Sequence, residues 1–346
     1  MLKNKKILLV RLSAMGDVVF NSPLANLLKK NGAQLNWLVS EKGYDIVNNN
    51  PCVDKVILAP IEKWKKNKNK LQNFKEYLEI IKTIRKENYD IVIDTQLILK
   101  SLIWTLFSGG KRRIVSKSAR EGAIIGGNEI IEPLFNDFKL HAVQNYFKFA
   151  KYLGLDTSEI IKTLPESSQE TKDYVAGLLS VLDKNKPILT IAPATTWKNK
   201  HWNRDNWFEL ISKLNPDKYN IVFVGTKNDT DLISLISQNK YLNLAGKTNL
   251  KQLIELFKNT DILISLDSGS THLAWLTDKP KILSIFTSTP KARYSPIGEK
   301  HIALQGNLDC QPCHRKKCPL ACDDCTKFPT VDEVYNALEE ISKDLY

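Results

Sequence analysis

The 346-residue sequence lacks any hydrophobic run long enough to cross a bilayer. Its longest apolar stretch, residues 97–107, is interrupted by Lys100, whereas a spanning helix needs about 20 mostly apolar residues. The apolar run Ile7–Val10 is cut by Arg11 and is too short for the core of a secretory signal. We therefore expect a soluble, cytoplasmic protein, and its 42% hydrophobic residues suffice for two ordinary domains.

Two phosphate-binding motifs are also missing. No G-x-G-x-x-G follows the first strand-like segment of either half, and no G-x-x-x-x-G-K-[ST] occurs anywhere in the chain. These absences argue against a dinucleotide-dependent dehydrogenase and against a P-loop NTPase. The chain also lacks low-complexity tracts and internal repeats of solenoid period, so we expect ordinary globular domains.

Basic residues are present in excess, and they are unevenly distributed. The net charge is +12, and residues 1–180 carry 28 Lys and Arg against 19 Asp and Glu. This excess suggests an anionic partner, such as nucleic acid, a phosphorylated glycolipid or a membrane surface. A lysine-rich composition that merely keeps the chain soluble would look the same. Nucleic acid is the weaker alternative, because no helix-turn-helix or RNP motif is recognisable.

Short buried segments alternate with helical patterns along both halves of the chain. The segments expected to be strands are Lys6–Val10, Leu35–Val39, Val53–Ala59, Tyr89–Asp94, Ile114–Ser116, Pro187–Ala192, Asn220–Val224, Ile262–Leu266 and Lys281–Phe286. This alternation predicts an α/β protein with parallel, doubly wound sheets. We expect two domains, residues 1–170 and 171–346, with ligands bound at the carboxyl ends of the strands in a cleft between them.

The first loop after a predicted strand reads RLSAMGDVVFNSP, from Arg11 to Pro23. It places Asp17 directly after Gly16, where a phosphate-binding loop would have more glycine and no carboxylate. Asp17 is either an ordinary helix cap or a residue of the chemical site.

A second informative loop, DSGSTHLAWL, follows the strand Ile262–Leu266. The small residues Ser268, Gly269 and Ser270 lead into a helix, and a helix N-terminus offers N–H donors and a positive dipole end to an anion. The bland alternative is a helix capped by Asp267 or Ser270, with His272 as a buried, hydrogen-bonded histidine.

The loop Pro193–Trp202 combines hydroxyls with basic side chains. Thr195, Thr196 and Lys200 suit a diphosphate, although a solvated lysine turn packed by tryptophans is the alternative. Together, the two loops predict that the C-terminal half binds a nucleotide diphosphate.

Four ordered segments resemble glycosyltransferase family 9, the ADP-heptose:lipopolysaccharide heptosyltransferases of Gram-negative bacteria. The segments are KILLVRLSAMGDVVFNSP, NYDIVIDTQLILKS, APATTWKNKHWNRDNWFELI and ISLDSGSTHLAWLTDKP. The resemblance implies a GT-B fold of two facing Rossmann-like domains, with the acceptor-binding domain first and the ADP-sugar-binding domain second. It also implies inverting, metal-independent transfer from ADP-heptose, without a cofactor, at the inner face of the cytoplasmic membrane. The acceptor would be the Kdo of Kdo–lipid A or the first heptose of the inner core. A related GT-B enzyme that uses another nucleotide-sugar is the alternative.

The resemblance also implies roles for individual residues. Asp17 matches the proposed general base. The donor-binding residues would be Thr195, Thr196, Lys200, Asp229, Asp267, Ser268, Gly269, Ser270 and His272. The acceptor-binding residues would be Ser13, Gly16, Lys63, Lys65, Lys66 and Arg120. Lys63, Lys65 and Lys66 stand in a loop that is often richer in arginine in the family, and lysine keeps the charge but loses the bidentate fork.

Two further stretches admit more than one explanation. Five of the six cysteines lie in CQPCHRKKCPLACDDC, residues 310–325. Three explanations are open for this segment. It is either a structural zinc site that uses Cys310, Cys313, Cys318 and Cys325, or a local turn with reduced thiols that also include Cys322, or a redox site. The run Lys63–Lys70 is either an arm for acceptor phosphates or the anionic inner leaflet, or a solvated helix start.

Overall fold

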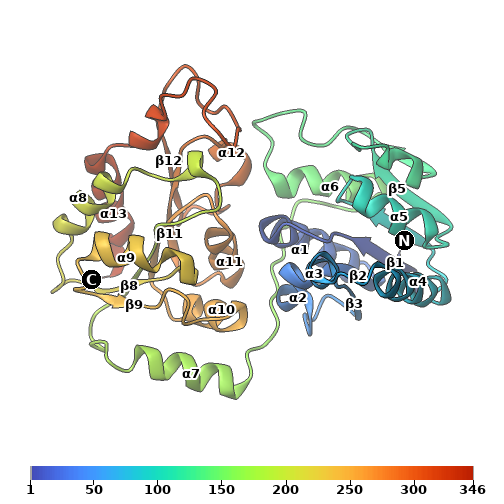
Figure 1. Ribbon diagram of the computed structural model, residues 1–346, viewed down its shortest axis with the longest axis horizontal. Helices are drawn as coiled ribbons and strands as arrows, with labels where there is room; N and C mark the ends of the chain where they lie inside the picture. Colours follow the sequence, from blue (N-terminus) through green and yellow to red (C-terminus); the bar gives the residue numbers. More distant parts are fainter. Residues whose placement is uncertain (1, 346) are drawn as a thin grey trace. The chain divides into compact units, whose positions relative to one another are not determined.

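The computed structural model describes residues 2–345. The chain forms two compact units, and the boundary along the sequence lies between Glu166 and Ser167. Each unit contains a six-stranded parallel sheet with helices packed against it (Figure 1). The division lies four residues before the boundary at residue 170 that the sequence suggested. Within the described residues, no helix is both long and apolar enough to cross a membrane.

The sheet of the first unit has the strand order β3-β2-β1-β4-β5-β6. Its strands are β1 Lys6–Val10, β2 Gln34–Ser40, β3 Lys55–Ala59, β4 Ile91–Asp94, β5 Arg112–Ser116 and β6 Glu129–Ile131. The central strand β1 pairs with β2 and β4, so that Ile7 lies opposite both Leu35 and Ile91. This strand is apolar throughout its buried length because helices can cover both faces of a parallel sheet.

The helices of this unit follow the strands in alternation. They are α1 Met15–Lys30, α2 Glu41–Val47, α3 Ile61–Lys66, α4 Lys70–Lys86, α5 Leu99–Phe107 and α6 Ala142–Tyr152, with a short 3-10 helix at Ala123–Gly126. Four residues separate the end of β1 from the start of helix α1, which packs against α6. These contacts bring the first turn of α1 close to residues of α6 that lie more than 120 positions later in the chain.

The second unit repeats this design with the strand order β12-β11-β10-β7-β8-β9. Its strands are β7 Ile188–Ala192, β8 Asn220–Phe223, β9 Leu242–Asn243, β10 Ile262–Leu266, β11 Lys281–Phe286 and β12 Ile302–Gln305. Its helices are α7 Gln169–Leu179, α8 Arg204–Lys213, α9 Thr230–Ser237, α10 Leu250–Lys258, α11 Gly269–Thr277, α12 Lys291–Tyr294 and α13 Val331–Ser342.

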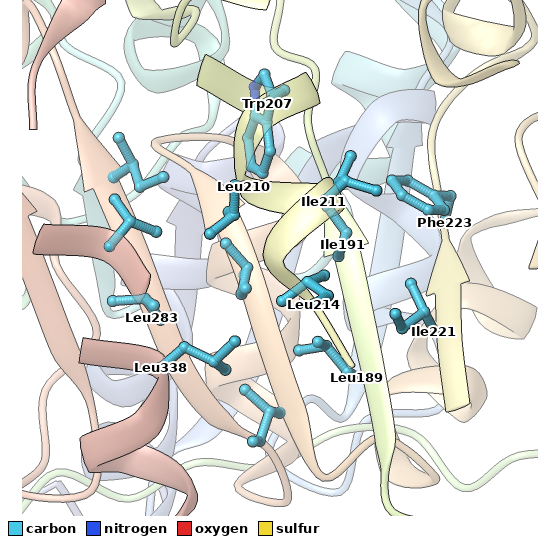
Figure 2. Packing of buried hydrophobic residues seen from close by; sticks show 14 of the residues in the cluster. Leu189, Ile191, Trp207, Leu210, Ile211, Leu214, Ile221, Phe223, Leu283 and Leu338 are labelled. Carbon is cyan, nitrogen blue, oxygen red and sulfur yellow. The ribbon is translucent and has the colours of Figure 1, made fainter. Parts of the chain in front are cut away.

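One large apolar cluster forms the core of the second unit (Figure 2). Leu210 of α8 and Leu338 of α13 pack with Leu189 and Leu283 of the sheet, and all four side chains are fully buried. Burying each such side chain stabilises the fold by about 1.5–3 kcal/mol. This core fixes the strands whose carboxyl ends carry the predicted donor loops.

The expected fold class and all nine expected strands are confirmed. The sequence reading missed β6, β9 and β12, because these short edge strands are only partly buried and carry a weaker apolar pattern than the central strands. It also treated PESSQETKD as a polar connection, whereas α7 begins within this segment. The hydroxyl of Ser168 caps that helix by accepting from the amide of Thr171 at 3.3 Å.

Candidate functional site

The predicted residues follow the carboxyl ends of the strands in both units. In parallel sheets these ends share one edge, which is where such folds bind ligands. In the first unit the loops after β1, β3 and β5 carry them, and in the second unit the loops after β7, β8 and β10 do. The two sets of residues are described separately below.

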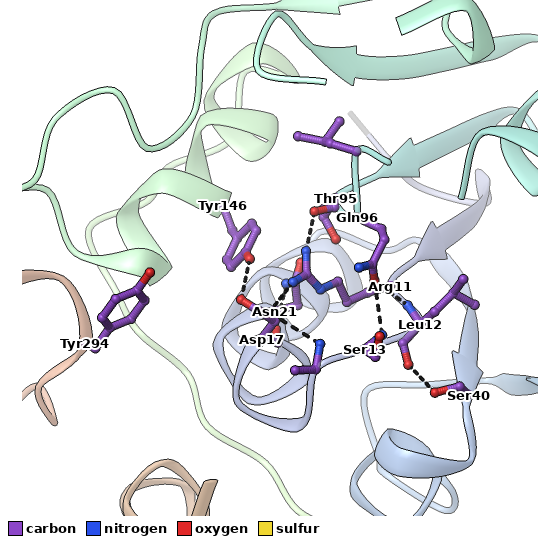
Figure 3. Close-up of polar contacts among 12 residues, drawn as sticks. Arg11, Leu12, Ser13, Asp17, Asn21, Ser40, Thr95, Gln96, Tyr146 and Tyr294 are labelled. Carbon is purple, nitrogen blue, oxygen red and sulfur yellow. Dashed lines mark hydrogen bonds and ion pairs between the residues drawn. The ribbon is translucent and has the colours of Figure 1, made fainter. Parts of the chain in front are cut away.

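Asp17 lies in the first turn of α1 and accepts hydrogen bonds from three directions (Figure 3). Arg11 forms an ion pair with Oδ2, and the backbone amide of Ala14 donates to the same oxygen at 3.3 Å. The hydroxyl of Tyr146, on α6, donates to Oδ1 at 3.1 Å. The carboxylate still exposes 34% of its side-chain surface, so it is oriented but remains open to a further partner.

Arg11 is the buried side of this pair, with 7% of its side chain exposed. Its guanidinium also donates to the backbone carbonyl of Thr95 at 2.5 Å and lies 5.5 Å from the ring centroid of Tyr146. Burial lowers the pKa of Arg11, but the adjacent Asp17 carboxylate outweighs burial, so its pKa is raised. The cation is therefore permanent, and it fixes the carboxylate rotamer.

The loop that leads to Asp17 is fixed by hydrogen bonds to Gln96, which follows the neighbouring strand β4. The side-chain carbonyl of Gln96 accepts from the amides of Leu12 and Ser13, both at 3.0 Å. Gln96 is itself placed by Asp94, whose buried carboxylate accepts from the Gln96 amide at 2.9 Å. Burial raises the pKa of Asp94. Residues 84 positions apart therefore fix this turn.

The basic residues predicted to bind the acceptor follow β3 and β5, two strands that are separated by three others in the sheet of the first unit. On α3, Lys63 pairs with Glu76 at 2.8 Å and Lys65 pairs with Glu62 at 2.7 Å, whereas Lys66 is exposed. Arg120 is exposed in the loop after β5, and its backbone amide donates to the carbonyl of Leu97. Two of the three predicted lysines are thus engaged with carboxylates, which any anionic ligand would have to displace.

In the second unit a buried carboxylate, Asp267, organises the predicted donor residues. Lys200 from the loop after β7 contacts its Oδ2 at 2.6 Å, and His272 Nε2 lies 3.3 Å from Oδ1. The hydroxyl of Thr289, after β11, also donates to Oδ2 at 2.6 Å. Thr195 donates to the Asp267 backbone carbonyl at 3.3 Å. Loops after three strands therefore meet at Asp267.

Asp267 carries a full negative charge despite being only 3% exposed. Burial alone would raise its pKa, but Lys200 and His272 outweigh burial and hold the pKa well below its ordinary value. Ser268 is the N-cap of α11, and Gly269 and Ser270 form its first turn. The first amides of a helix have no acceptor within the helix and can bind an anion. In α11 this turn follows Asp267 by one residue.

The remaining predicted donor residues are less closely connected with Asp267. Thr196 is exposed. Asp229 accepts from both the amide and the hydroxyl of Thr226 at 2.7 Å, so it stabilises the turn after β8. The donor contact that the resemblance implies for Asp229 would require this carboxylate to serve two partners.

Three residues of these clusters were missed by sequence reasoning. Tyr146 is one aromatic residue of an ordinary amphipathic helix, and nothing in the sequence links it to Asp17. Arg11 carried a signal, because a charged residue ends an otherwise apolar strand. Thr289 lies in TSTP, a hydroxyl-rich loop after β11, and the rule that function follows strand ends would have found it.

The five clustered cysteines surround one cavity of about 10 Å³, which Asn199 of the β7 loop also lines. All six cysteines of the chain are free thiols. Across residues 2–345, no three His, Cys, Asp or Glu side chains are grouped so that they could hold a metal ion. The expected zinc ligands therefore converge on one place without forming a coordination sphere.

Comparisons with known proteins agree with this architecture. Residues 77–323 match the family model described as glycosyltransferase family 9 (heptosyltransferase). The chain is 31% identical to lipopolysaccharide heptosyltransferase 1 of Campylobacter coli, over 83% of this chain and 85% of that protein. It is 26% identical to the protein of the same name from Pseudomonas aeruginosa, over 90% and 87%.

Solved structures show the same fold. The crystal structure of a family 9 glycosyl transferase from Veillonella parvula superposes with a TM-score of 0.81 at 17% identity, covering 99% of this chain and 98% of that one. The Escherichia coli heptosyltransferase WaaC with ADP superposes with a TM-score of 0.75 at 22% identity, covering 97% and 99%.

Proposed function

The chain belongs to glycosyltransferase family 9, and we propose that it transfers a heptose from ADP-heptose to the inner core of lipopolysaccharide. Relatives that match over most of the chain carry the name lipopolysaccharide heptosyltransferase 1, which supports this activity. The expected GT-B arrangement assigns the acceptor to the first unit and the ADP-sugar to the second.

The observation that supports the mechanism is that the Asp17 carboxylate is both partly exposed and held in one orientation. An inverting displacement needs one base on the acceptor hydroxyl and a stabilised leaving group on the opposite side of the sugar. Asp17 is partly exposed, and Arg11, Tyr146 and the Ala14 amide fix its orientation. A carboxylate can take the hydroxyl proton late in the reaction, as positive charge develops on that oxygen. Asp17 is therefore the proposed general base.

The second unit would stabilise the departing ADP. Lys200, the hydroxyls of Thr195 and Thr196, and the first turn of α11 are donors that suit a diphosphate. Because Lys200 contacts Asp267, it is positioned before the donor arrives. With these groups at the leaving oxygen, the proposed reaction requires no divalent metal.

The proposed acceptor is the Kdo of Kdo–lipid A or the first heptose added to it. The name that both of these relatives carry, lipopolysaccharide heptosyltransferase 1, favours the first transfer. The proposed contacts of the acceptor are Lys63, Lys65, Lys66 and Arg120, with Ser13 and Gly16 beside the base.

Such an acceptor is anchored in a lipid bilayer, and we propose that the first unit contacts the inner leaflet of the cytoplasmic membrane. Helix α4 exposes Leu71, Phe74 and Leu78 at spacings that place them on one face. The lysine-rich run that precedes and begins this helix is exposed. Each lysine near an anionic leaflet contributes about 1 kcal/mol, so both features suit this surface.

The test is product analysis with a defined set of substrates. The purified protein is incubated with ADP-heptose and either Kdo–lipid A or the same glycolipid carrying one heptose, and the products are weighed by mass spectrometry. The expected result is the addition of one heptose to one of the two acceptors, without added metal and with chelator present. Transfer from a UDP- or GDP-sugar but not from ADP-heptose would reject the proposed donor.

A further inference from the structure

The cysteine segment, residues 310–325, lies directly on the predicted donor loop. The His314 amide donates to the carbonyl of Ser288 at 2.7 Å, and the Asn199 side chain donates to the carbonyl of Arg315 at 3.2 Å. Lys198 also pairs with Asp323 at 3.1 Å. The segment is therefore fastened to the loops after β7 and β11 that surround Asp267.

These attachments bring basic side chains of the segment against Trp197. The His314 ring stacks on the indole with the centroids 6.1 Å apart and an interplanar angle of 28°. Lys316 Nζ lies 5.4 Å from the same centroid, and Lys200 Nζ lies 4.7 Å from it. Trp197 thus joins the segment to the lysine that contacts Asp267, and cations favour such an aromatic neighbour.

The predicted donor residues offer hydrogen-bond donors to a diphosphate but little net positive charge. Lys200 is neutralised by Asp267 at 2.6 Å, so this pair contributes no net positive charge to an incoming anion. The first turn of α11 supplies only about half a positive charge. A further cation would therefore strengthen the binding of a nucleoside diphosphate, and Lys316, which shares Trp197 with Lys200, is placed to supply one.

The environment of His314 is consistent with a positive potential at this place. Burial lowers the pKa of His314, and the nearby charges of Arg293 and Lys200 lower it further. Its Nε2 lies 3.4 Å from the Tyr294 hydroxyl. An imidazole N–H can donate a hydrogen bond to a phosphate oxygen, and an arriving anion would offset the nearby positive charges.

We propose that the cysteine segment forms part of the donor site, where Lys316 and His314 bind the diphosphate of the nucleotide-sugar. This inference rests on the proposed function, because it takes the cluster around Asp267 as the donor site. The five clustered thiols line a small cavity together with Asn199 of the β7 loop.

Calorimetric titration of ADP into the full chain and its variants tests the inference. Lys317 is exposed, adjacent and of the same charge, so Lys317→Ala is the matched control for Lys316→Ala. Lys316→Ala should weaken ADP binding about three- to tenfold for a lost charge-assisted contact, whereas Lys317→Ala should stay within about twofold. Adenosine, which lacks phosphates, should bind all three proteins equally. His314→Ala should weaken ADP binding, and His314→Gln, which keeps a donor, should restore part of it.

Thermal melts of each variant identify any variant that fails to fold, and the Lys316 comparison does not depend on the histidine variants. Equal ADP affinities for Lys316→Ala and Lys317→Ala would overturn the inference. If Lys200→Ala weakens ADP binding while Lys316→Ala does not, the inference alone fails. If the wild-type protein binds neither ADP, UDP nor GDP, the proposed donor site fails and the inference with it.

Discussion

Two aspartates follow strand ends in the two units, and they differ in one decisive respect. Asp17 and Asp267 each pair with a cation, Arg11 in one case and Lys200 in the other. Asp17 leaves 34% of its side chain exposed, whereas Asp267 leaves 3%. In the first pair the cation is buried and the carboxylate is open. In the second pair the carboxylate is the more deeply buried partner.

This difference separates two uses of the same chemical group. A carboxylate that must accept a proton from a substrate needs an open face and a fixed orientation, as Asp17 has. A carboxylate enclosed by Lys200, His272 and Thr289 serves to hold those side chains in place. We therefore expect changes at Asp17 to affect the reaction, and changes at Asp267 to affect stability and donor binding together.

The largest expected effect on stability comes from Lys200→Ala. This change leaves the buried Asp267 charge without its lysine, and breaking a buried pair costs about 3–5 kcal/mol. Denaturant unfolding should report this loss, and ADP binding should weaken with it. Lys198→Ala is the control, because Lys198 is 82% exposed and its pair with Asp323 lies at the surface, where such pairs contribute about 0–1 kcal/mol. Equal unfolding free energies for the two variants would contradict the buried-pair description.

A second prediction concerns the pH dependence of stability. The pKa of Asp267 in the folded protein lies below its ordinary value of 3.8 because Lys200 and His272 outweigh burial. The stabilisation from this ionised group is therefore fully present above the ordinary pKa and is lost as the pH falls toward the folded value. The stability difference between the wild type and Asp267→Asn should be constant from pH 7 to 5 and should shrink below about pH 4. A difference that stays constant down to pH 3 would show that the charge of Asp267 does not matter.

The smallest expected effect comes from Tyr146→Phe. Removing the hydroxyl that donates to Asp17 at 3.1 Å leaves the carboxylate less firmly oriented. We expect a roughly 2- to 10-fold lower transfer rate, for a hydrogen bond of about 0.5–1.5 kcal/mol, with ADP affinity unchanged. A transfer rate equal to that of the wild type would mean that Tyr146 only packs against α1.

The sequence predicts single site residues better than it predicts the contacts between them, because the contacting residues lie far apart along the chain. Asp17, Lys200 and Asp267 were singled out as candidates because each follows a strand, and ligand loops gather at those ends. Their partners were found less well, because contacts between distant residues leave no local pattern. Tyr146 lies 129 positions from Asp17, and Lys200 and Asp267 were each predicted without their mutual contact.

The cysteine segment shows the same limit. Its spacing left a zinc site, a turn with reduced thiols and a redox site open, and the five thiols line one small cavity. The attachment of this segment to Asn199 and Ser288 could not be predicted, because it depends on how the ends of β7 and β11 are placed.

The most direct test of the central claim is the transfer rate of Asp17→Asn, measured together with its ADP affinity and its thermal stability. The proposed mechanism predicts a roughly 10²–10⁴-fold slower transfer for a lost general base, with ADP bound as tightly as by the wild type. Thermal stability should fall only by what a lost cap costs, about 0.5–2 kcal/mol. Transfer near the wild-type rate would contradict the claim and leave Asp17 as a helix cap.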